Sequence, residues 1–498
     1  MTEDNHGRKR LTRRKFIKHT GEVGASVALA PLVLNLSACS TSPAASTGKT
    51  GAKSGTGVPS QGGSTPNTAA SGGAAPAGGA GASNASPGGS PASGSAGSGN
   101  PGSGGGSTTP GGGAGSGASG GGGANMTTAS AIADGAVLLG LYTGDGKAAV
   151  QEAAKKLDFS WLKSGDTVLI KVAVNSQYTH PTTTSPNGVS GMVAELKARG
   201  AGKVIVADQS GVEHVRLSAM GRYAGGTTRD MFMMSGMMAV EQAGAETHFF
   251  DDQPFDTGYF SATLPDGNHW PRGLYLPAIV KQVDHIIYMP RIGNHVLAGV
   301  TLSQKSAIGW IRDDSRHDLH NDAMDYYEKY TEINYTKEIR DRFRMAVTVS
   351  EKVLLHGGPD TGTPYDMNPV LVHASTSMPN HDALGASMLV TLNQKSPTVA
   401  AGTQVYDAAN APTSNSFFAD GLSVVTGAAG PWTSGSTQTL YTAHMWEQGI
   451  TKDRAIARGW TLSGGMPTKI DIVLDGEPLD PDIKSGLVTH GEGLYTFG

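Results

Sequence analysis

The segment Thr167-Val-Leu-Ile-Lys-Val-Ala-Val174 follows a Gly-Asp turn and is predicted to form a buried β-strand. Residues 186–199 carry apolar side chains at helical spacing, and Gly200 comes directly after them as a typical helix stop. Lys203-Val-Ile-Val-Ala-Asp208 is predicted to be a second buried strand. This strand–helix–strand order decides the fold class, because two strands joined through a helix usually lie parallel in one sheet.

The same alternation continues along the chain. A helix is predicted over 231–243, and strands are predicted over 246–251 and 284–290. We therefore expect an α/β fold with a largely parallel sheet and flanking helices, built either as one body or as two lobes. Ligands of such sheets bind beyond the carboxyl ends of the strands. The loops after residues 174, 208 and 290 are thus where a site is expected.

The first 39 residues carry the features of an export signal. Thr12-Arg13-Arg14-Lys15-Phe16-Ile17-Lys18 resembles the twin-arginine consensus, and an uncharged stretch follows over 23–36. That stretch is shorter than the roughly 20 apolar residues that span a bilayer, and it has the length of a signal-peptide apolar region. Leu36-Ser37-Ala38-Cys39 resembles a lipobox, and Cys39 is the sole cysteine. Each feature alone has a plain structural explanation, but their order favours a lipoprotein signal.

The signal predicts the partners and the location of the protein. We expect the twin-arginine export machinery to recognise Arg13 and Arg14, and lipid on Cys39 to anchor the chain to a membrane. The protein would then be exported across the cytoplasmic membrane and held in the cell envelope, on the periplasmic or the surface side. With Cys39 lipidated, disulfides, cysteine-ligated zinc and iron–sulfur clusters held by cysteine are excluded from the rest of the chain.

Composition divides the chain into four parts. Residues 1–39 form the predicted signal. Residues 40–125 consist almost wholly of Gly, Ser, Ala, Pro and Thr. This composition predicts a disordered tether with an end-to-end reach on the order of 50 Å. Residues 126–400 are predicted to be the α/β domain, and residues 401–498 an extension that completes or caps it. The net charge of the chain is −4 although the signal is basic, so nucleic-acid binding is not expected.

Polar residues gather in the three predicted loops. A lysine beside a glycine-containing loop at a strand end binds an anion as a point charge, and a nearby histidine exchanges protons near neutral pH. Each residue also has a structural alternative, as a solvated lysine, a hydrogen-bonded histidine or, for His320, a solvated helix face. The candidates are His180, His295 and Lys305 as catalytic residues, and Lys305, Ser303 and Asp208 as ligand- or cofactor-binding residues.

Ordered motifs over about residues 165–390 resemble the domain-of-unknown-function 362 family. They include Gly165-Asp-Thr-Val-Leu-Ile-Lys-Val, the Pro-Thr-Thr-Thr loop that begins at Pro181, Gly358-Pro-Asp-Thr-Gly362 and Pro379-Asn-His-Asp382. Members of that family often add ferredoxin-type cysteine clusters. This chain has none, so the resemblance does not imply electron transfer through iron–sulfur clusters here.

A weaker similarity concerns the nickel-pincer lactate racemase superfamily. His295 and Lys305 keep its ten-residue spacing, with Ser303 between them. The resemblance implies that the lysine holds the pincer nucleotide covalently, that the histidine moves a proton, and that a further histidine binds nickel. His320 is the corresponding metal candidate, one residue off the usual spacing, and His180 stands where that superfamily has an arginine. The cofactor is therefore left unknown, with a metal or a pincer nucleotide as candidates.

Two functions follow from these observations. The first is an enzyme or cofactor-binding protein that takes a small anionic molecule in a cleft lined by His180, His295 and Lys305. The second is a non-catalytic binding or structural lipoprotein displayed at the surface, which the long tether favours. The sequence names no substrate.

Overall fold

The central sheet begins with the strand–helix–strand unit that the sequence predicts. The computed structural model describes residues 131–295, 298–320, 322, 325–356, 358–396 and 449–498. Strand β2 (Thr167–Val172) pairs in parallel with β3 (Lys203–Asp208) on one side and with β9 (His285–Met289) on the other. Strand β6 (Glu246–Phe249) continues the sheet in parallel beyond β3. The predicted α/β fold with a largely parallel sheet is thereby confirmed.

Two long strands turn the sheet antiparallel near its middle. β13 (Thr363–Ser375) runs antiparallel to β12 (Phe343–His356) and to β1 (Val137–Tyr142), whereas β12 is parallel to β9. In the described residues the strands follow the order β15-β14-β1-β13-β12-β9-β2-β3-β6, and β10 (Gly293–His295) and β11 (Gly299–Thr301) form a side branch on β12. Two small antiparallel pairs lie outside the sheet: β4 (Val215–Ser218) with β5 (Gly221–Gly225), and β7 (Tyr259–Ser261) with β8 (Tyr275–Pro277).

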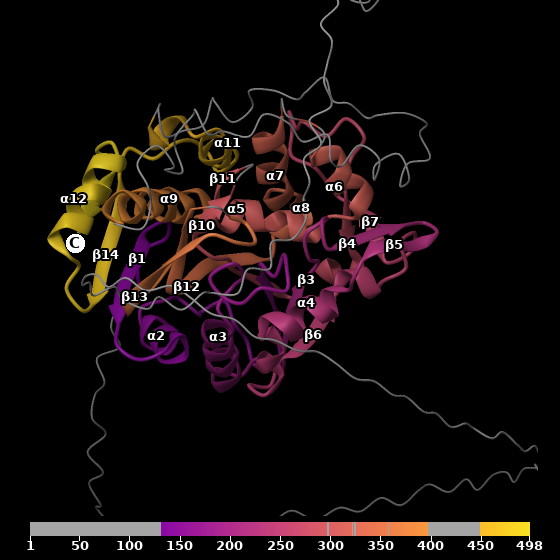
Figure 1. Cartoon of the computed structure of the whole chain (residues 1–498), viewed down its shortest axis with the longest axis horizontal. Coiled ribbons are helices and arrows are strands. Elements are labelled where there is room, and N and C mark those ends of the chain that lie inside the picture. The colour runs from indigo at the N-terminus through magenta and orange to yellow at the C-terminus, as the bar shows by residue number, and fades with distance from the viewer. Residues whose placement is uncertain (1–130, 296–297, 321, 323–324, 357, 397–448) are drawn as a thin grey trace, which may run out of the picture. The chain divides into compact units, whose positions relative to one another are not determined.

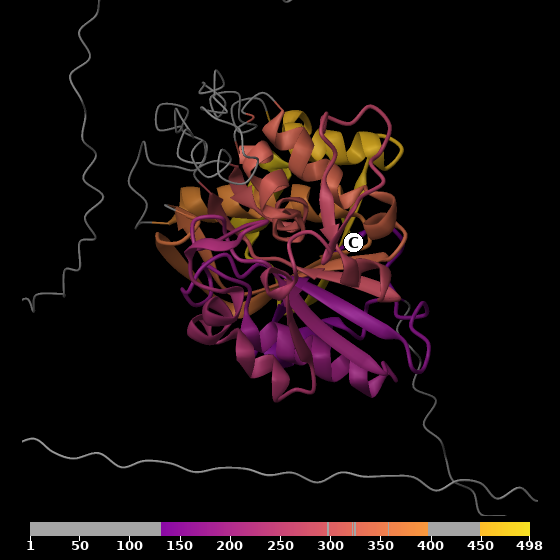
Figure 2. The ribbon, with the colours of Figure 1, turned by 90° about the vertical axis from the view of Figure 1, so that its right-hand side faces the viewer.

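Helices cover both faces of the sheet, as Figures 1 and 2 show. One apolar core joins the sheet to α2, α3 and α4, through buried residues such as Val150, Met192 and Phe232. On the opposite face, two further clusters join the sheet to α7, α9 and α11. The helices are α2 (Gly146–Ala153), α3 (Pro186–Ala198), α4 (Thr228–Ser235), α5 (Ser303–Ser306), α6 (Asp313–His320), α7 (Tyr326–Asn334), α8 (Lys337–Arg340), α9 (Met378–Lys395), α11 (Arg454–Leu462) and α12 (Pro481–His490).

Helix ends follow local sequence signals. The Ser185 side chain caps α3 by accepting a hydrogen bond from the backbone N–H of Gly188, and Gly200 ends this helical region with a φ of +100°. The helix predicted over 231–243 is split instead. Gly236, with a φ of 84°, ends α4 and separates it from a 3₁₀ helix at Met237–Glu241, because a left-handed residue cannot continue an α-helix.

The last part of the chain joins the same sheet. β14 (Ile470–Gly476) lies parallel to β1, and β15 (Tyr495–Phe497) lies parallel to β14, while α12 packs against α9. No helix among the described residues is both long enough and apolar enough to pass through a bilayer. The predicted signal with Arg13, Arg14 and Cys39 and the predicted tether over 40–125 lie outside the described residues. So do residues 401–448 of the predicted extension.

Candidate functional site

A cavity of about 190 Å³ opens at the carboxyl ends of β2, β3 and β9. Its wall includes Asn175 after β2, the segment from Asp208 to His214 after β3, and Arg291 after β9. Lys305 on α5 and Asp360 from the turn between β12 and β13 complete it. These are the loops in which ligands of parallel sheets bind. The cavity is therefore the candidate functional site of the described part of the chain.

A buried ion pair joins the ends of β2 and β3 beneath the cavity. Lys171 Nζ lies 2.6 Å from Asp208 Oδ1, and both side chains are almost fully buried. Nζ also donates to the carbonyl oxygens of Val172 at 2.8 Å and Ser306 at 3.0 Å. Asp208 Oδ2 accepts from the backbone N–H of Val174 at 2.7 Å. Since its oxygens are engaged by the protein, Asp208 supports the cavity wall and offers little to a ligand.

Lys305 is the basic residue that the protein leaves available. It is mostly buried and lines the cavity, yet no hydrogen bond or ion pair ends on its Nζ among the described residues. Burial and the nearby charges of Arg291 and Arg316 lower the pKa of Lys305 to about 7, against the opposing charges of Asp360 and Glu213. A lysine in this state exchanges its proton with a ligand near neutral pH.

Arg291 adds a second cation to the same wall. Arg291 is 1% exposed. Its guanidinium donates to the backbone carbonyl oxygens of Pro181 and Pro359, each at 3.2 Å. The Nε–H has no acceptor in the described structure, and no carboxylate lies within ion-pair distance there. Burial lowers the pKa of Arg291 to about 10, so the side chain stays charged at neutral pH.

Two histidines of the cavity are fixed in opposite tautomers. His295 Nδ1 accepts from the backbone N–H of Ala298 at 3.3 Å, so the neutral ring carries its proton on Nε2. His320 Nδ1 lies 2.7 Å from the carbonyl oxygen of Arg316 and donates to it, which leaves the lone pair on Nε2. Burial lowers the pKa of both rings, for His320 to about 3, and both are therefore neutral at pH 7. One ring is a donor at Nε2 and the other is an acceptor.

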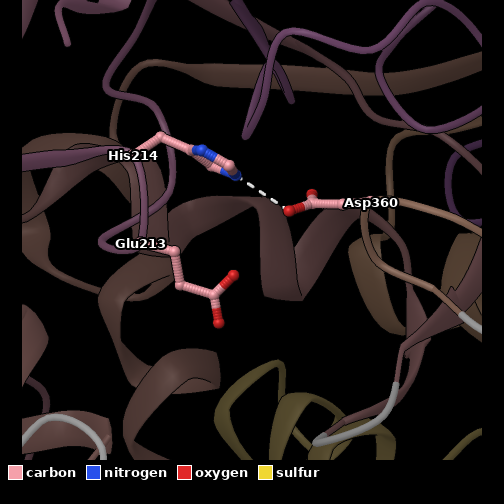
Figure 3. Close-up of side chains that lie close together, drawn as sticks. All are labelled: Glu213, His214 and Asp360. Carbon is pink, nitrogen blue, oxygen red and sulfur yellow. Dashed lines mark hydrogen bonds and ion pairs between the residues drawn. The ribbon is translucent and has the colours of Figure 1, made fainter. Parts of the chain in front are cut away.

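The part of the wall formed by Glu213, His214 and Asp360 is acidic and is drawn in Figure 3. Ligand atoms of Glu213, His214 and Asp360 all lie within 4.8 Å of one another. His214 Nε2 lies 2.8 Å from Asp360 Oδ2, and Asn175 donates to Asp360 Oδ1 at 2.7 Å. The bond to Asp360 raises the pKa of His214. Burial alone would raise the pKa of Asp360, but the hydrogen bond from His214 lowers it overall.

The structure brings some predicted residues together and separates others. His295, Lys305, His320 and Asp208 line one cavity, whereas His180 and Ser303 are not part of its wall. Nδ1 of His180 lies 3.1 Å from the Thr183 carbonyl oxygen, and Nε2 accepts from the backbone N–H of Lys352 at 3.1 Å. With both ring nitrogens engaged by backbone, His180 holds the loop that carries Pro181.

Ser303 also has a structural position. It is fully buried, its hydroxyl donates to Asp382 Oδ1 at 2.6 Å, and its backbone N–H donates to the same oxygen at 2.9 Å. Asp382 Oδ2 accepts from the backbone N–H of Gln304 at 2.9 Å. Asp382 thus caps the start of α5 and positions the helix that presents Lys305.

The acidic wall could not be assembled from the sequence. Glu213 and His214 stand in a loop that the sequence marks as polar, but their partner Asp360 is 146 residues away from His214. The turn that carries Asp360 joins two antiparallel strands, and no local pattern places such a turn beside the end of β3. The position of Arg291 near the site could be expected from the sequence, because this residue directly follows the strand predicted over 284–290.

Fold and cavity together define an α/β protein with a mixed-charge cavity at the carboxyl ends of its parallel strands. The sequence model of the family Domain of unknown function (DUF362) matches residues 168–387. The matched residues include those that line the cavity. No curated protein matches the sequence.

Two solved structures show a remote likeness. The lactate racemase apoprotein from Thermoanaerobacterium thermosaccharolyticum has 10% identity and a TM-score of 0.36, with 72% of this chain and 87% of that chain covered. A protein from Thermotoga maritima has 13% identity and a TM-score of 0.29, with 44% of this chain covered. This chain spans about half, 52%, of the Thermotoga protein.

The residues of the cavity fit a pincer nucleotide only in part. Lys305, His295 and His320 do share one wall, and Nε2 of His320 carries a lone pair suited to a metal. His180, however, lies outside the wall. The volume of about 190 Å³ is also close to that of a cavity of about 150 Å³ that holds benzene, which is much smaller than a nucleotide. We therefore derive no chemical step through that group.

Proposed function

We propose that the protein binds a small organic anion in the cavity and exchanges a proton with it, while lipid on Cys39 holds the chain at an envelope membrane. The observation that carries the proposal is the pair of cations Lys305 and Arg291. Both line the cavity, and neither has a carboxylate within ion-pair distance in the described structure. Burying a charged group away from water without a counterion costs roughly several kcal/mol of free energy. A bound anion would supply that counterion.

The chemistry of the two cations favours a carboxylate or a phosphate. Arg291 keeps an unused Nε–H, and a guanidinium pairs with two oxygens of one planar anion. Lys305 adds a point charge from another element of the wall. The cavity volume of about 190 Å³ suits a molecule of roughly benzene size, which corresponds to an acid of a few carbon atoms.

Proton exchange is supported by the residues next to that anion site. Lys305 has a pKa of about 7, so near neutral pH part of the protein carries a neutral amine that accepts a proton and part carries an ammonium that returns one. A proton donor and an acceptor beside one bound anion are the requirements of general acid–base catalysis. The enzyme function is thus favoured over plain capture of the anion.

Export and anchoring are proposed from the amino-terminal sequence alone. Arg13 and Arg14 are proposed to direct the folded chain to the twin-arginine machinery, and Cys39 to carry the lipid. The test is fractionation of cells that express the wild-type chain, Cys39→Ser or Arg13→Lys with Arg14→Lys. Loss of lipid without loss of export is expected for the first variant, and cytoplasmic retention for the double variant. Equal behaviour of all three chains would refute this part.

The cavity is tested with the purified full chain. Calorimetric titration with acetate, lactate, malonate and inorganic phosphate identifies the anion class. Lys305→Met is expected to weaken binding about tenfold, whereas Lys395→Met, which removes a lysine paired at the surface with Asp480 and Asp482, leaves it unchanged. If none of the anions binds, or if both variants behave alike, the anion site is wrong.

Proton exchange has a separate readout. A carbon acid that binds is incubated with the protein in deuterated water, and the loss of its α-proton signal is followed by nuclear magnetic resonance. Exchange is expected with the wild-type chain and not with Lys305→Met, compared at anion concentrations high enough to saturate that variant. Binding without exchange in the wild-type chain would leave a non-catalytic anion-binding protein.

A further inference from the structure

The acidic wall of the cavity has a donor set that the anion proposal does not use. Glu213, His214 and Asp360 offer two carboxylate oxygens and an imidazole nitrogen, all within 4.8 Å of one another. Figure 3 shows the three side chains pointing toward a common space from two different loops. We propose that these residues bind one divalent transition-metal ion at this wall.

Electrostatic strain between the two carboxylates favours a cation between them. A carboxylate oxygen of Glu213 lies within 4.8 Å of one of Asp360, and two negative charges at this separation repel each other. No hydrogen bond or ion pair holds the Glu213 carboxylate among the described residues. It is therefore able to move the short distance that brings its oxygen to the roughly 2 Å expected for a metal–oxygen bond.

The other two ligands are already arranged. His214 Nε2 and Asp360 Oδ2 are joined by a hydrogen bond of 2.8 Å, so both point at the same position. A metal ion there replaces the proton that the two atoms share. Asn175 donates to the second oxygen of Asp360 at 2.7 Å and fixes the orientation of that carboxylate, as supporting residues of metal sites do.

A buried hydroxyl next to Asp360 points to the same use. Ser176 is fully buried, and its Oγ has no hydrogen-bond partner in the described structure. It lies close enough to lower the pKa of Asp360, though outside hydrogen-bonding geometry. A small rotation of Asp360 toward a metal allows this hydroxyl to donate to the carboxylate. The cost of the unpaired buried hydroxyl is then removed.

The donor set selects the class of metal. An imidazole with two carboxylates suits Zn²⁺ or Mn²⁺, whereas Ca²⁺ and Mg²⁺ prefer oxygen ligands alone. Three protein ligands leave further coordination positions open, and here those positions face the cavity. Two carboxylates neutralise the divalent charge, so Lys305 and Arg291, which line the same cavity, still attract an anion. Metal and anion are thus expected to bind side by side.

The site is tested on the full chain after its metal is removed with a chelator. Calorimetric titration at about pH 7.5 with Zn²⁺ and Mn²⁺ is expected to show one equivalent bound, and Mg²⁺ and Ca²⁺ are expected to bind at least about tenfold more weakly. His214→Ala and Asp360→Asn should each weaken Zn²⁺ binding by tenfold or more, as should Glu213→Gln. The control His490→Ala, in a helix remote in sequence from the cavity loops, should bind as the wild-type chain does.

Comparing metal binding with thermal unfolding shows whether a variant has lost only the metal site or has also lost its folded structure. Glu213 is exposed and unpaired in the described structure, so Glu213→Gln is expected to unfold at the wild-type temperature. Binding of Zn²⁺ should also weaken toward about pH 5, because a proton competes for His214. Unchanged binding in Glu213→Gln, or the same loss in His490→Ala, would overturn the proposal. Binding of methylammonium instead of a metal would also overturn it and would make the wall an amine site.

Anions are titrated separately, in the presence of chelator, so that anion binding is measured independently of metal binding. The metal site stands if Zn²⁺ binds with the expected variant pattern and no anion binds at all. It fails if anions bind as proposed and Zn²⁺ does not.

Discussion

Two lysines lie beside the same cavity in opposite circumstances. Lys171 is fully buried, and its three protons are taken by Asp208 and by the carbonyl oxygens of Val172 and Ser306. Lys305 is the residue next to Ser306, yet its Nζ has no partner among the described residues. The first lysine is fully used by the fold. The second retains binding capacity, and this difference indicates which of the two serves a ligand.

Removing each lysine should produce the largest contrast in stability. Lys171→Met leaves Asp208 buried without its counterion, and we expect a loss of about 3–5 kcal/mol in the free energy of unfolding. Lys305→Met removes a poorly solvated charge that lacks a partner, so its stability should stay within about 0.5 kcal/mol of wild type or rise. Urea denaturation of both variants measures the two values. Similar losses would show that Lys305 is as structural as Lys171.

A smaller effect is expected from crowding the ion pair of Lys171. A Cβ added at Gly309 would lie 2.1 Å from Asp208 Oδ1 and 2.6 Å from Lys171 Nζ. Gly309→Ala must displace the pair, and we expect a loss of about 1–3 kcal/mol. In Gly226→Ala the new Cβ meets nothing closer than 3.4 Å, which makes it the matched control. An unchanged melting temperature in Gly309→Ala would mean that the pair moves freely.

The smallest effect is a pH dependence that belongs to Lys305. With a pKa of about 7, Lys305 is charged below that pH and increasingly neutral above it. Affinity for the anion should therefore fall between about pH 6 and pH 8.5, by less than about tenfold because Arg291 stays charged. Unfolded Lys305 keeps its proton up to about pH 10.4, so this residue makes the fold more stable as pH rises from 7 to 10. Calorimetry over this range with wild type and Lys305→Met checks the first effect, and a pH slope that persists in the variant would assign it elsewhere.

Strands β2, β3, β6 and β9 could be predicted because each depends on a short pattern, whereas β1, β12 and β13 and the order of strands in the sheet were not predicted. The strands around Val168 and Val204 are continuous apolar runs, and the structure places them at the positions expected. The helix over 231–243 was predicted too long, because apolar periodicity continues through Gly236 while the backbone there is left-handed. A local break in dihedral angle does not disturb a hydrophobic pattern, so the pattern alone cannot reveal it.

The sequence could place candidate residues in the cavity where they stand at or after the end of a predicted strand, as Asp208, His295 and Lys305 do. His295 and Lys305 share one segment after β9, and both line the cavity. His180 also follows a strand, but its ring turns to the backbone of Thr183 and Lys352, which only tertiary contacts decide. The pairing of His214 with Asp360 depends on how a distant hairpin packs, and a single sequence carries no signal for it.

The position of β1 has a consequence for the order of assembly. β1 is hydrogen-bonded on one side to β13 and on the other to β14, and Val137 faces Ile472 across the second pair. A ribosome adds about 5–20 residues per second, so the first strand waits on the order of tens of seconds for its last neighbour. The sheet cannot close at this edge of β1 before β14 has been synthesised. Nascent chains shortened before β14 should therefore expose one edge of β1 and stay open to proteases or chaperones.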